Sequence, residues 1–300
     1  MSATTGNERK AVASLRAMLA RLIDYAGLFP PASLDMRTAV ENYARYQQGK
    51  HAEMLARFIV PASRLGEFES ASNSLAFGSA WPLSALVTDP VHDMPAIAEF
   101  NQRNASRFVV DAVELKASSP EEILHSRVLI HHSITPFFEI APESAPELLP
   151  VILRVDGRAK IRTGGITASA FPTSEMIVDF ILGCVRYEVA FKATAGLHHP
   201  VRSLRPLTYA SDAPTGLMHG FLNVFVASVF AQQGIERQRL VEILACDDAR
   251  GFQFTDLGAT WRDLSASVEE IATVRNGFAI SFGSCSFEEP VADLRELELL

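Results

Sequence analysis

Cysteine is scarce in this chain, and its spacing is not that of a metal site or a disulfide framework. The 300 residues include Cys184, Cys246 and Cys285, an odd number without a CxxC pair. Neither a zinc knuckle nor a set of disulfides is therefore predicted. We expect a reducing compartment, the cytoplasm.

Long apolar runs are absent as well. Segment 1–22 lacks the continuous apolar core of a signal peptide, and we find no stretch long enough and free enough of charge to span a membrane. The apolar run 220–231 has no cationic flank. It is therefore predicted to lie in the core or in the subunit interface of a homo-oligomer.

Positive charge is in deficit. The chain has 27 basic and 35 acidic residues, a formal net charge of -8, and no basic run. Since a phosphate backbone requires concentrated positive charge, a nucleic-acid partner is not expected. A hydrophobic content of 48% with 21% charged residues is typical of a globular chain with a sizeable core.

Short β-like runs alternate with amphipathic helical stretches over most of the length. The alternation predicts parallel strands joined by helices, and the count and the length favour a (β/α)8 TIM barrel within a single domain, 1–300. We expect strands over 22–28, 56–62, 82–88, 108–117, 135–141, 159–165, 189–196 and 278–284. We expect helices over 35–48, 64–76, 92–104, 119–127, 144–156 and 173–187. No GxGxxG follows the first strand, so dinucleotide binding is not predicted.

A helical insertion is predicted between the seventh and eighth barrel strands, at about 197–277. One helix would suffice there, yet the interval holds helix-like segments at 216–234, 236–245 and 267–276. An insertion at this point would lie over the mouth of the barrel, as a lid, a dimer contact or a further packing element. The tail, 287–300, is predicted to form a final amphipathic helix.

Lysine is rare, and two of the five lysines occupy similar settings. Lys160 lies in "AKIRTGG" (159–165) and Lys192 in "AFKATAGLHHP" (190–200), each near the end of a short apolar run that breaks into glycine. Side chains alternate along a strand, and the outer face of a barrel strand is covered by helices. We therefore expect polar side chains near strand ends to point into the mouth: Asp24, Arg57, Glu114, Lys116, Glu139, Lys160, Arg162, Lys192 and Thr194.

Two lysines on adjacent strands favour amine nucleophilic catalysis. A lysine must be neutral to attack a carbonyl, and a neighbouring ammonium and a desolvated site should lower the pKa of each lysine. Glu114 or Asp24 could then move protons or position a water molecule. Ordinary ion pairing in a polar barrel core is the alternative for any one of these residues.

Five short motifs resemble class I deoxyribose-phosphate aldolases. "KIRTGG" and "FKATAG" are similar to the sixth and seventh strands of that family. The other three resemble its opening segment, its fourth strand and its last strand, and all five occur in the same order: "IDYAGLFPPAS" (23–33), "VDAVELKAS" (110–118) and "SFGSCSF" (281–287).

The resemblance implies a carbon–carbon lyase that forms a Schiff base with a small carbonyl substrate, phosphorylated or otherwise anionic, and needs no cofactor. It makes Lys160 the Schiff-base lysine, Lys192 the lysine that lowers its pKa, and Glu114 and Asp24 the acidic partners. It also places Gly196, Gly283 and Ser284 where that family binds its substrate phosphate, and a glycine turn before a helix N-terminus suits an anion.

The chain departs from the family pattern at several positions. Arg162 replaces a small hydroxyl residue, Lys116 adds a charge, and "LHHPVR" (197–202) replaces the short phosphate-binding turn. These departures predict a different acidic or keto-acid substrate, or loss of the aldolase reaction. The predicted substrate-binding residues are Arg162, Lys116, Arg57, Glu139, Thr194, Gly196, His198, His199, Gly283 and Ser284.

Two other functions remain open. The pairs His131–His132 and His198–His199 could contribute to a metal-dependent hydrolase or lyase, together with Asp24, Glu139 or Cys285. Adjacent histidines of a strand point to opposite faces, however, and no HExxH or HxH spacing is present, so no metal site is predicted. The other function is a non-catalytic barrel that binds a small anionic metabolite.

Overall fold

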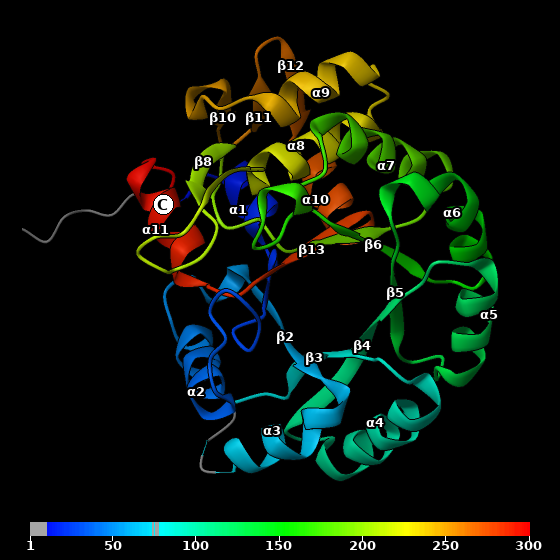
Figure 1. Cartoon of the computed structure of the whole chain (residues 1–300). Helices are drawn as coiled ribbons and strands as arrows, with labels where there is room; N and C mark the ends of the chain where they lie inside the picture. The colour runs from blue at the N-terminus through cyan, green and yellow to red at the C-terminus, as the bar shows by residue number, and fades with distance from the viewer. Residues whose placement is uncertain (1–10, 74, 76–77) are drawn as a thin grey trace, which may run out of the picture.

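Eight parallel strands form a closed barrel in the computed structural model, which describes residues 11–73, 75 and 78–300. The order around the barrel is β1-β13-β7-β6-β5-β4-β3-β2 (Figure 1). The strands are β1 (Ile23–Tyr25), β2 (Leu55–Pro61), β3 (Trp81–Leu86), β4 (Phe108–Lys116), β5 (Thr135–Glu139), β6 (Arg158–Arg162), β7 (Phe191–Thr194) and β13 (Ala279–Ser284). The predicted (β/α)8 barrel and its eight strands are confirmed.

The first six barrel strands are each followed by a helix, and these six helices form much of the outer layer (Figure 1). Most begin at a side-chain cap: Asp35 accepts a hydrogen bond from the Thr38 amide, Ser119 from that of Glu122, and Thr173 from that of Met176. The helices are α2 (Met36–Gln47), α3 (Leu65–Ala71), α4 (Pro90–Asn104), α5 (Pro120–Leu129), α6 (Ala145–Arg154) and α7 (Ser174–Arg186). Part of the predicted end of the helix over 64–76 lies outside the described residues.

The strand register places predicted site residues beside one another on adjacent strands of the barrel. Lys160 of β6 lies opposite Glu139 of β5 and Lys192 of β7. On the other side of β7, Thr194 lies opposite Gly283 of β13. Because parallel strands end at the same edge, the residues after these positions meet at the carboxyl-terminal mouth.

The interval between β7 and β13 is an insertion, as predicted, but it is not purely helical. It contains α8 (Phe221–Gln232), α9 (Arg237–Ala245) and α10 (Val268–Gly277), together with two small antiparallel sheets. One sheet pairs β8 (Ser203–Pro206) with β9 (Thr215–Met218), and the other joins β10 (Phe252–Phe254), β11 (Gly258–Trp261) and β12 (Leu264–Ser267). The predicted helix over 216–234 begins later, at Phe221, because residues 216–218 belong to β9 and pair with β8.

Helix α8 is the apolar run discussed above, and it is buried along most of its length. It contacts α7, α9, α10 and β13, so it takes part in the outer layer of the barrel. The predicted final helix is α11 (Glu288–Glu296). An unpredicted helix, α1 (Ala13–Leu19), packs on α10 and on the three-stranded sheet.

One segment, Ala168–Arg186, has the length and composition of a membrane span, with 19 residues and a mean hydropathy of 1.3. The sequence-based expectation that no stretch is long and apolar enough to span a membrane is therefore not met by this segment. The segment is interrupted between the 3-10 turn η4 (Ala168–Ala170) and α7, where Pro172 lies. A helix of 13 residues is about 20 Å long, shorter than the roughly 30 Å of a bilayer core.

Gly196 offers a test of how closely the two lysine strands approach each other. Its φ is +74°, and a Cβ placed there would lie 2.7 Å from the Cα of Gly164. We expect Gly196→Ala to destabilise the fold by roughly 1–3 kcal/mol, because both the backbone conformation and the contact are unfavourable. Urea-induced unfolding measures the effect.

The matched control is Gly66→Ala in α3, where no described atom lies within 4 Å of an added Cβ. Alanine should stabilise this helix by about 0.5–1 kcal/mol. Equal unfolding midpoints for G196A and the parent chain would contradict the predicted close approach.

Candidate active site

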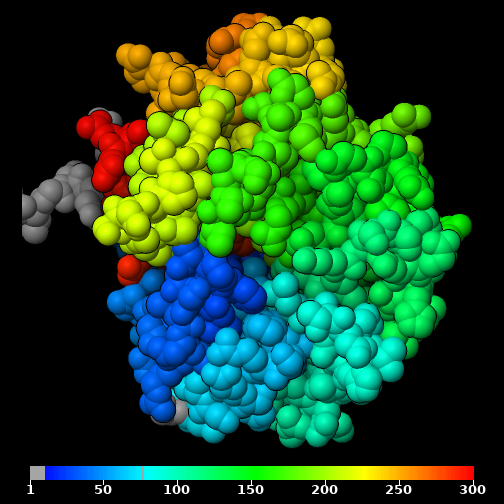
Figure 2. Space-filling model, in the orientation of Figure 1, coloured from blue at the N-terminus to red at the C-terminus, as the bar shows by residue number. Residues whose placement is uncertain are grey.

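A cavity of about 640 Å³ lies at the carboxyl-terminal mouth of the barrel. Its walls come from strand ends, from the segment after β1 (Ala26, Phe29–Pro31) and from the β8–β9 hairpin (Arg205–Ala210, Met218). In the space-filling view the blue, green and yellow-green surfaces of these segments meet over the end of the barrel (Figure 2). The insertion therefore covers the mouth, as one of its predicted roles requires.

The floor of the cavity is a buried network of lysines and carboxylates. Glu114 binds both lysines: its Oε2 lies 2.7 Å from Nζ of Lys160, and its Oε1 lies 2.7 Å from Nζ of Lys192. Lys160 also contacts Oε2 of Glu139 at 2.7 Å, and Lys192 donates a hydrogen bond to Asp24. The structure thus brings together the four residues predicted to be catalytic.

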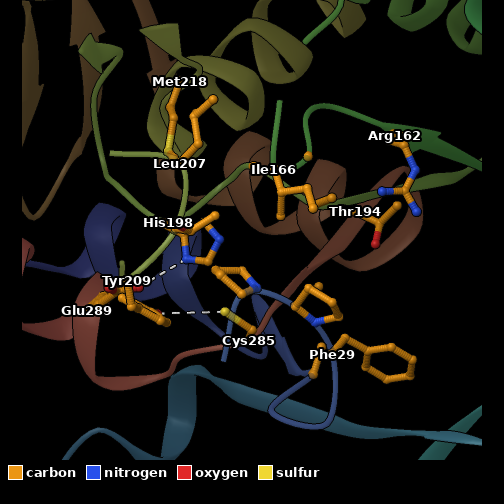
Figure 3. Close-up of a pocket in the computed structure, with 18 of the residues that line it drawn as sticks. Phe29, Arg162, Ile166, Thr194, His198, Leu207, Tyr209, Met218, Cys285 and Glu289 are labelled. Atoms are coloured by element: carbon orange, nitrogen blue, oxygen red, sulfur yellow. Dashed lines mark hydrogen bonds and ion pairs between the residues drawn. The ribbon is translucent and has the colours of Figure 1, made fainter. Parts of the chain in front are cut away.

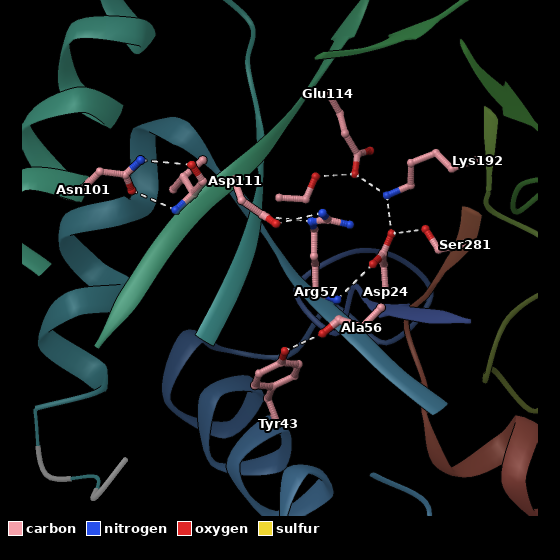
Figure 4. A network of polar contacts seen from close by, with 11 residues as sticks. Asp24, Tyr43, Ala56, Arg57, Asn101, Asp111, Glu114, Lys192 and Ser281 are labelled. Carbon is pink, nitrogen blue, oxygen red and sulfur yellow. Dashed lines mark hydrogen bonds and ion pairs between the residues drawn. The ribbon is translucent and has the colours of Figure 1, made fainter. Parts of the chain in front are cut away.

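Two serines complete this network, and sequence reasoning did not identify them. Ser84 of β3 donates to Oε1 of Glu114 at 2.7 Å, and Ser281 of β13 donates to Oδ2 of Asp24 at 2.7 Å (Figure 4). The backbone N–H of Arg57 gives Asp24 a further hydrogen bond of 2.9 Å. Strand alternation could have identified Ser281, because it lies two residues before Gly283 on the same strand and therefore on the same face.

The balance of charge keeps the network ionised. Burial raises the pKa of Glu114, but the two neighbouring ammonium groups outweigh it, and the pKa of this carboxyl is well below its ordinary value. Burial lowers the pKa of Lys192, yet Asp24 and Glu114 together raise it above its ordinary value. The expectation of a lowered pKa is therefore wrong for Lys192, because carboxylates, not another ammonium, are its direct contacts.

The two lysines differ in their access to the cavity. Lys160 and Glu114 are among the described residues that line it, whereas Lys192 is not. Lys192 lies beneath, fully enclosed, with its Nζ 5.3 Å from the centre of the Phe137 ring. Lys160 is the lysine that a bound molecule could reach.

Several predicted binding residues line the cavity above Lys160. The guanidinium of Arg162 is half exposed and lies 3.5 Å from Oε1 of Glu139, whose other oxygen binds Lys160. Burial raises the pKa of Glu139, but the charge of Lys160 more than offsets it and the pKa is lowered. Besides Arg162, the predicted residues in the described lining are Thr194, Gly196, His198, His199 and Gly283, whereas Glu139 is outside it.

In the part of the chain that the structure describes, three more predicted binding residues lie outside the lining, in addition to Glu139. Arg57 is in the first half of β2, away from the mouth, where its guanidinium makes hydrogen bonds of 2.7 and 2.8 Å to Asp111 (Figure 4). Ser284 is buried outside the lining and donates to the Ser286 carbonyl at 2.6 Å, since alternation turns it away from the face of Gly283. Lys116 is exposed at the end of β4, outside the lining.

The rim of the cavity includes residues that sequence reasoning missed. Tyr209 and Arg205 come from the hairpin, whose two strands were not predicted. Cys285 follows β13, and its Sγ lies 3.8 Å from the Tyr209 hydroxyl; Glu289 comes from α11 (Figure 3). Because a hairpin loop and a helix turn reach the mouth only in the folded chain, strand alternation could not identify them.

The histidine pairs do not form a metal site. Nδ1 of His198 lies 3.0 Å from Oε2 of Glu289, and His199 is paired in the same way with Asp293. His131 and His132 precede β5, at the end of the barrel opposite the mouth. Within residues 11–73, 75 and 78–300, no group of three or more His, Cys, Asp or Glu is placed to hold a metal ion.

The bridging role of Glu114 can be tested through stability. Replacing one member of a buried charge network leaves the others unpaired, so Glu114→Gln should destabilise the fold by about 3–5 kcal/mol at neutral pH. A carboxyl with a lowered pKa stabilises the folded state above its unfolded pKa, and this contribution disappears as the pH falls. The difference in unfolding free energy between E114Q and the parent chain should therefore shrink as the pH falls below 4.5, the ordinary pKa of a glutamate.

Urea midpoints measured between pH 3 and 7 would provide this comparison. The control is Glu67→Gln, which removes an exposed i, i+3 pair with Arg64 and should leave the midpoint nearly unchanged. A deficit in E114Q that stays constant over this range would contradict the ionised network.

Comparisons with known proteins find similarity among solved structures only. No family model matches the chain, and no curated protein matches it. Among solved structures, a deoxyribose phosphate aldolase from Aeropyrum pernix, described as having a unique tetrameric structure, is 12% identical with a TM-score of 0.34. The match covers 94% of this chain and 93% of the aldolase. That protein belongs to the family that the short motifs resemble, but a similarity this remote does not assign function or assembly.

Proposed function

We propose that this chain is a class I aldolase-like lyase that forms a Schiff base with a small anionic carbonyl compound. The observation that supports the proposal best is the position of Lys160. Its side chain is only 3% exposed and lines a cavity large enough for a small metabolite, and its amine contacts two carboxylates. An amine in such a site can exchange its proton with a neighbouring group and then act as a nucleophile.

In the proposed reaction, Lys160 passes its proton to Glu139 or Glu114 and attacks the carbonyl carbon. A proton moves from the nitrogen to the oxygen to give the neutral carbinolamine, and the same carboxyl group then protonates its hydroxyl, which leaves as water and gives an iminium ion. Cleavage of the carbon–carbon bond sends its electron pair toward the iminium nitrogen. Asp24 and Glu114 raise the pKa of Lys192, which therefore contributes its positive charge beside Glu114.

The anionic substrate class is supported by Arg162. This residue lies two positions beyond Lys160 on the same face of β6, about 6.6 Å further toward the mouth. Its guanidinium is half exposed and has a long contact of 3.5 Å with Glu139. A planar guanidinium in this position can bind a substrate carboxylate with two parallel hydrogen bonds.

The decisive experiment is borohydride trapping followed by peptide mapping. With a panel of aldehydes, ketones and keto acids, we expect a reduced adduct on Lys160. Lys160→Arg, which keeps the positive charge between Glu114 and Glu139, should abolish the adduct. Lys50→Arg, which alters an exposed lysine outside the described cavity lining, should leave the adduct intact.

The possible outcomes separate the alternatives. An adduct on Lys192 instead of Lys160 would overturn the assignment of the nucleophile. Absence of any adduct over the whole panel would refute the Schiff-base mechanism and favour a barrel that binds a small anion without reaction.

The role of Arg162 is tested by comparing a charged and a neutral carbonyl probe. Arg162→Gln should weaken the trapping of pyruvate, seen as a rise of about 10–100-fold in the concentration that half-saturates adduct formation. This factor corresponds to the loss of one hydrogen bond to a charged group, which contributes about 1.5–3 kcal/mol. Trapping of acetaldehyde should change little, and an equal loss for both probes would contradict carboxylate recognition.

A further inference from the structure

His198 and Glu289 form a pair that faces the cavity from the side opposite Arg162 and Thr194 (Figure 3). His198 lies four residues after the end of β7 and is 8% exposed, and Glu289 is in the first turn of α11. The 3.0 Å contact between Nδ1 of His198 and Oε2 of Glu289 joins the two elements. Both members of the pair line the cavity.

The contact indicates which ring nitrogen of a neutral His198 carries the hydrogen. Burial raises the pKa of Glu289, but the hydrogen bond and charge of His198 more than offset it, and the pKa is lowered. An ionised carboxylate can only accept hydrogen bonds, so Nδ1 of a neutral His198 must carry the hydrogen. Its Nε2 is then an unprotonated acceptor on the edge of the ring that points away from Glu289 and toward the cavity (Figure 3).

The carboxylates on the floor of the cavity are less suited to a second proton transfer. Both oxygens of Glu114 are bound to ammonium groups, the two oxygens of Glu139 contact Lys160 and Arg162, and Asp24 is fully buried beneath. At the rim, burial raises the pKa of the Cys285 thiol and that of the Tyr209 hydroxyl above their ordinary values, so both are protonated at neutral pH. His198 and His199 both line the cavity with Nδ1 paired to a carboxylate, and the second ring nitrogen of His198 is the one seen turned toward the cavity (Figure 3).

We infer that His198 is the general base that removes and returns the proton on the carbon next to the iminium carbon, and that Glu289 positions it. The inference rests on the proposed Schiff-base function. Nε2 takes the proton, the C–H electron pair forms the C=C bond of an enamine, and the iminium π pair moves to the Lys160 nitrogen. The imidazolium ion is stabilised by Glu289, and the reverse step restores the neutral ring.

The test separates imine formation from proton transfer, using pyruvate as the probe in D₂O. Exchange of its methyl protons, followed by NMR, reports the enamine step, and borohydride trapping reports the imine. His198→Gln should slow exchange by about 10²–10⁴-fold while trapping at Lys160 stays within about twofold of the parent chain. Imidazole added to H198A should restore exchange.

Two further variants define the roles. His92→Gln is the matched control, because Nδ1 of His92 is also paired with a carboxylate, that of Asp89, but His92 lies outside the described cavity lining. The H92Q protein should catalyse exchange at the rate of the parent chain. Glu289→Gln should exchange faster than Glu289→Ala, because an amide oxygen still accepts the Nδ1 hydrogen.

The results distinguish a wrong role for His198 from a wrong Schiff-base function. Normal exchange in H198Q, or loss of trapping together with exchange, would overturn the role of His198 while the parent chain still forms its adduct. A parent chain that forms no adduct and catalyses no exchange would overturn the proposed function and this step together.

Discussion

The carboxylate of Glu114 is the interaction on which the site depends. A buried ammonium group is stable only beside an opposite charge, and here one carboxylate serves two of them, from β6 and β7. Asp24 and Glu139 then complete the contacts of Lys192 and Lys160. The barrel supplies this geometry because the register pairs Glu139 with Lys160 and Lys160 with Lys192, and Glu114 lies on β4 two residues before Lys116, the partner of Glu139.

The same network divides the lysines into two roles. Lys192 is enclosed and has a raised pKa, so it contributes a permanent charge, whereas Lys160 reaches the cavity. Above Lys160 the wall is no longer built from the barrel alone. The β8–β9 hairpin and α11 contribute Tyr209, Arg205 and Glu289 to the rim. The insertion is therefore part of the cavity as well as an elaboration of the barrel.

Most of the fold could be predicted because its hydrophobic periods are regular. The eight strands and the six helices that alternate with them lie close to their predicted ranges, since each buries an apolar face against the next layer. The hairpin was missed because β9 (Thr215–Met218) leads directly into the apolar α8, and a continuous apolar run does not reveal where pairing ends and a helix begins. The small three-stranded sheet was missed for the related reason that its strands are only three or four residues long.

By itself the sequence determined the faces of the strands: alternation placed Lys160, Lys192, Glu114 and Asp24 inside the barrel. The tertiary structure decided what those faces meet. It placed Arg57 beside Asp111 instead of in the mouth, turned Ser284 outward, and raised the pKa of Lys192 where a lowered one was expected. The physical reason is that charge balance and depth in the barrel depend on residues far apart in the chain, such as Asp24 and Lys192, which only the closed barrel brings into contact.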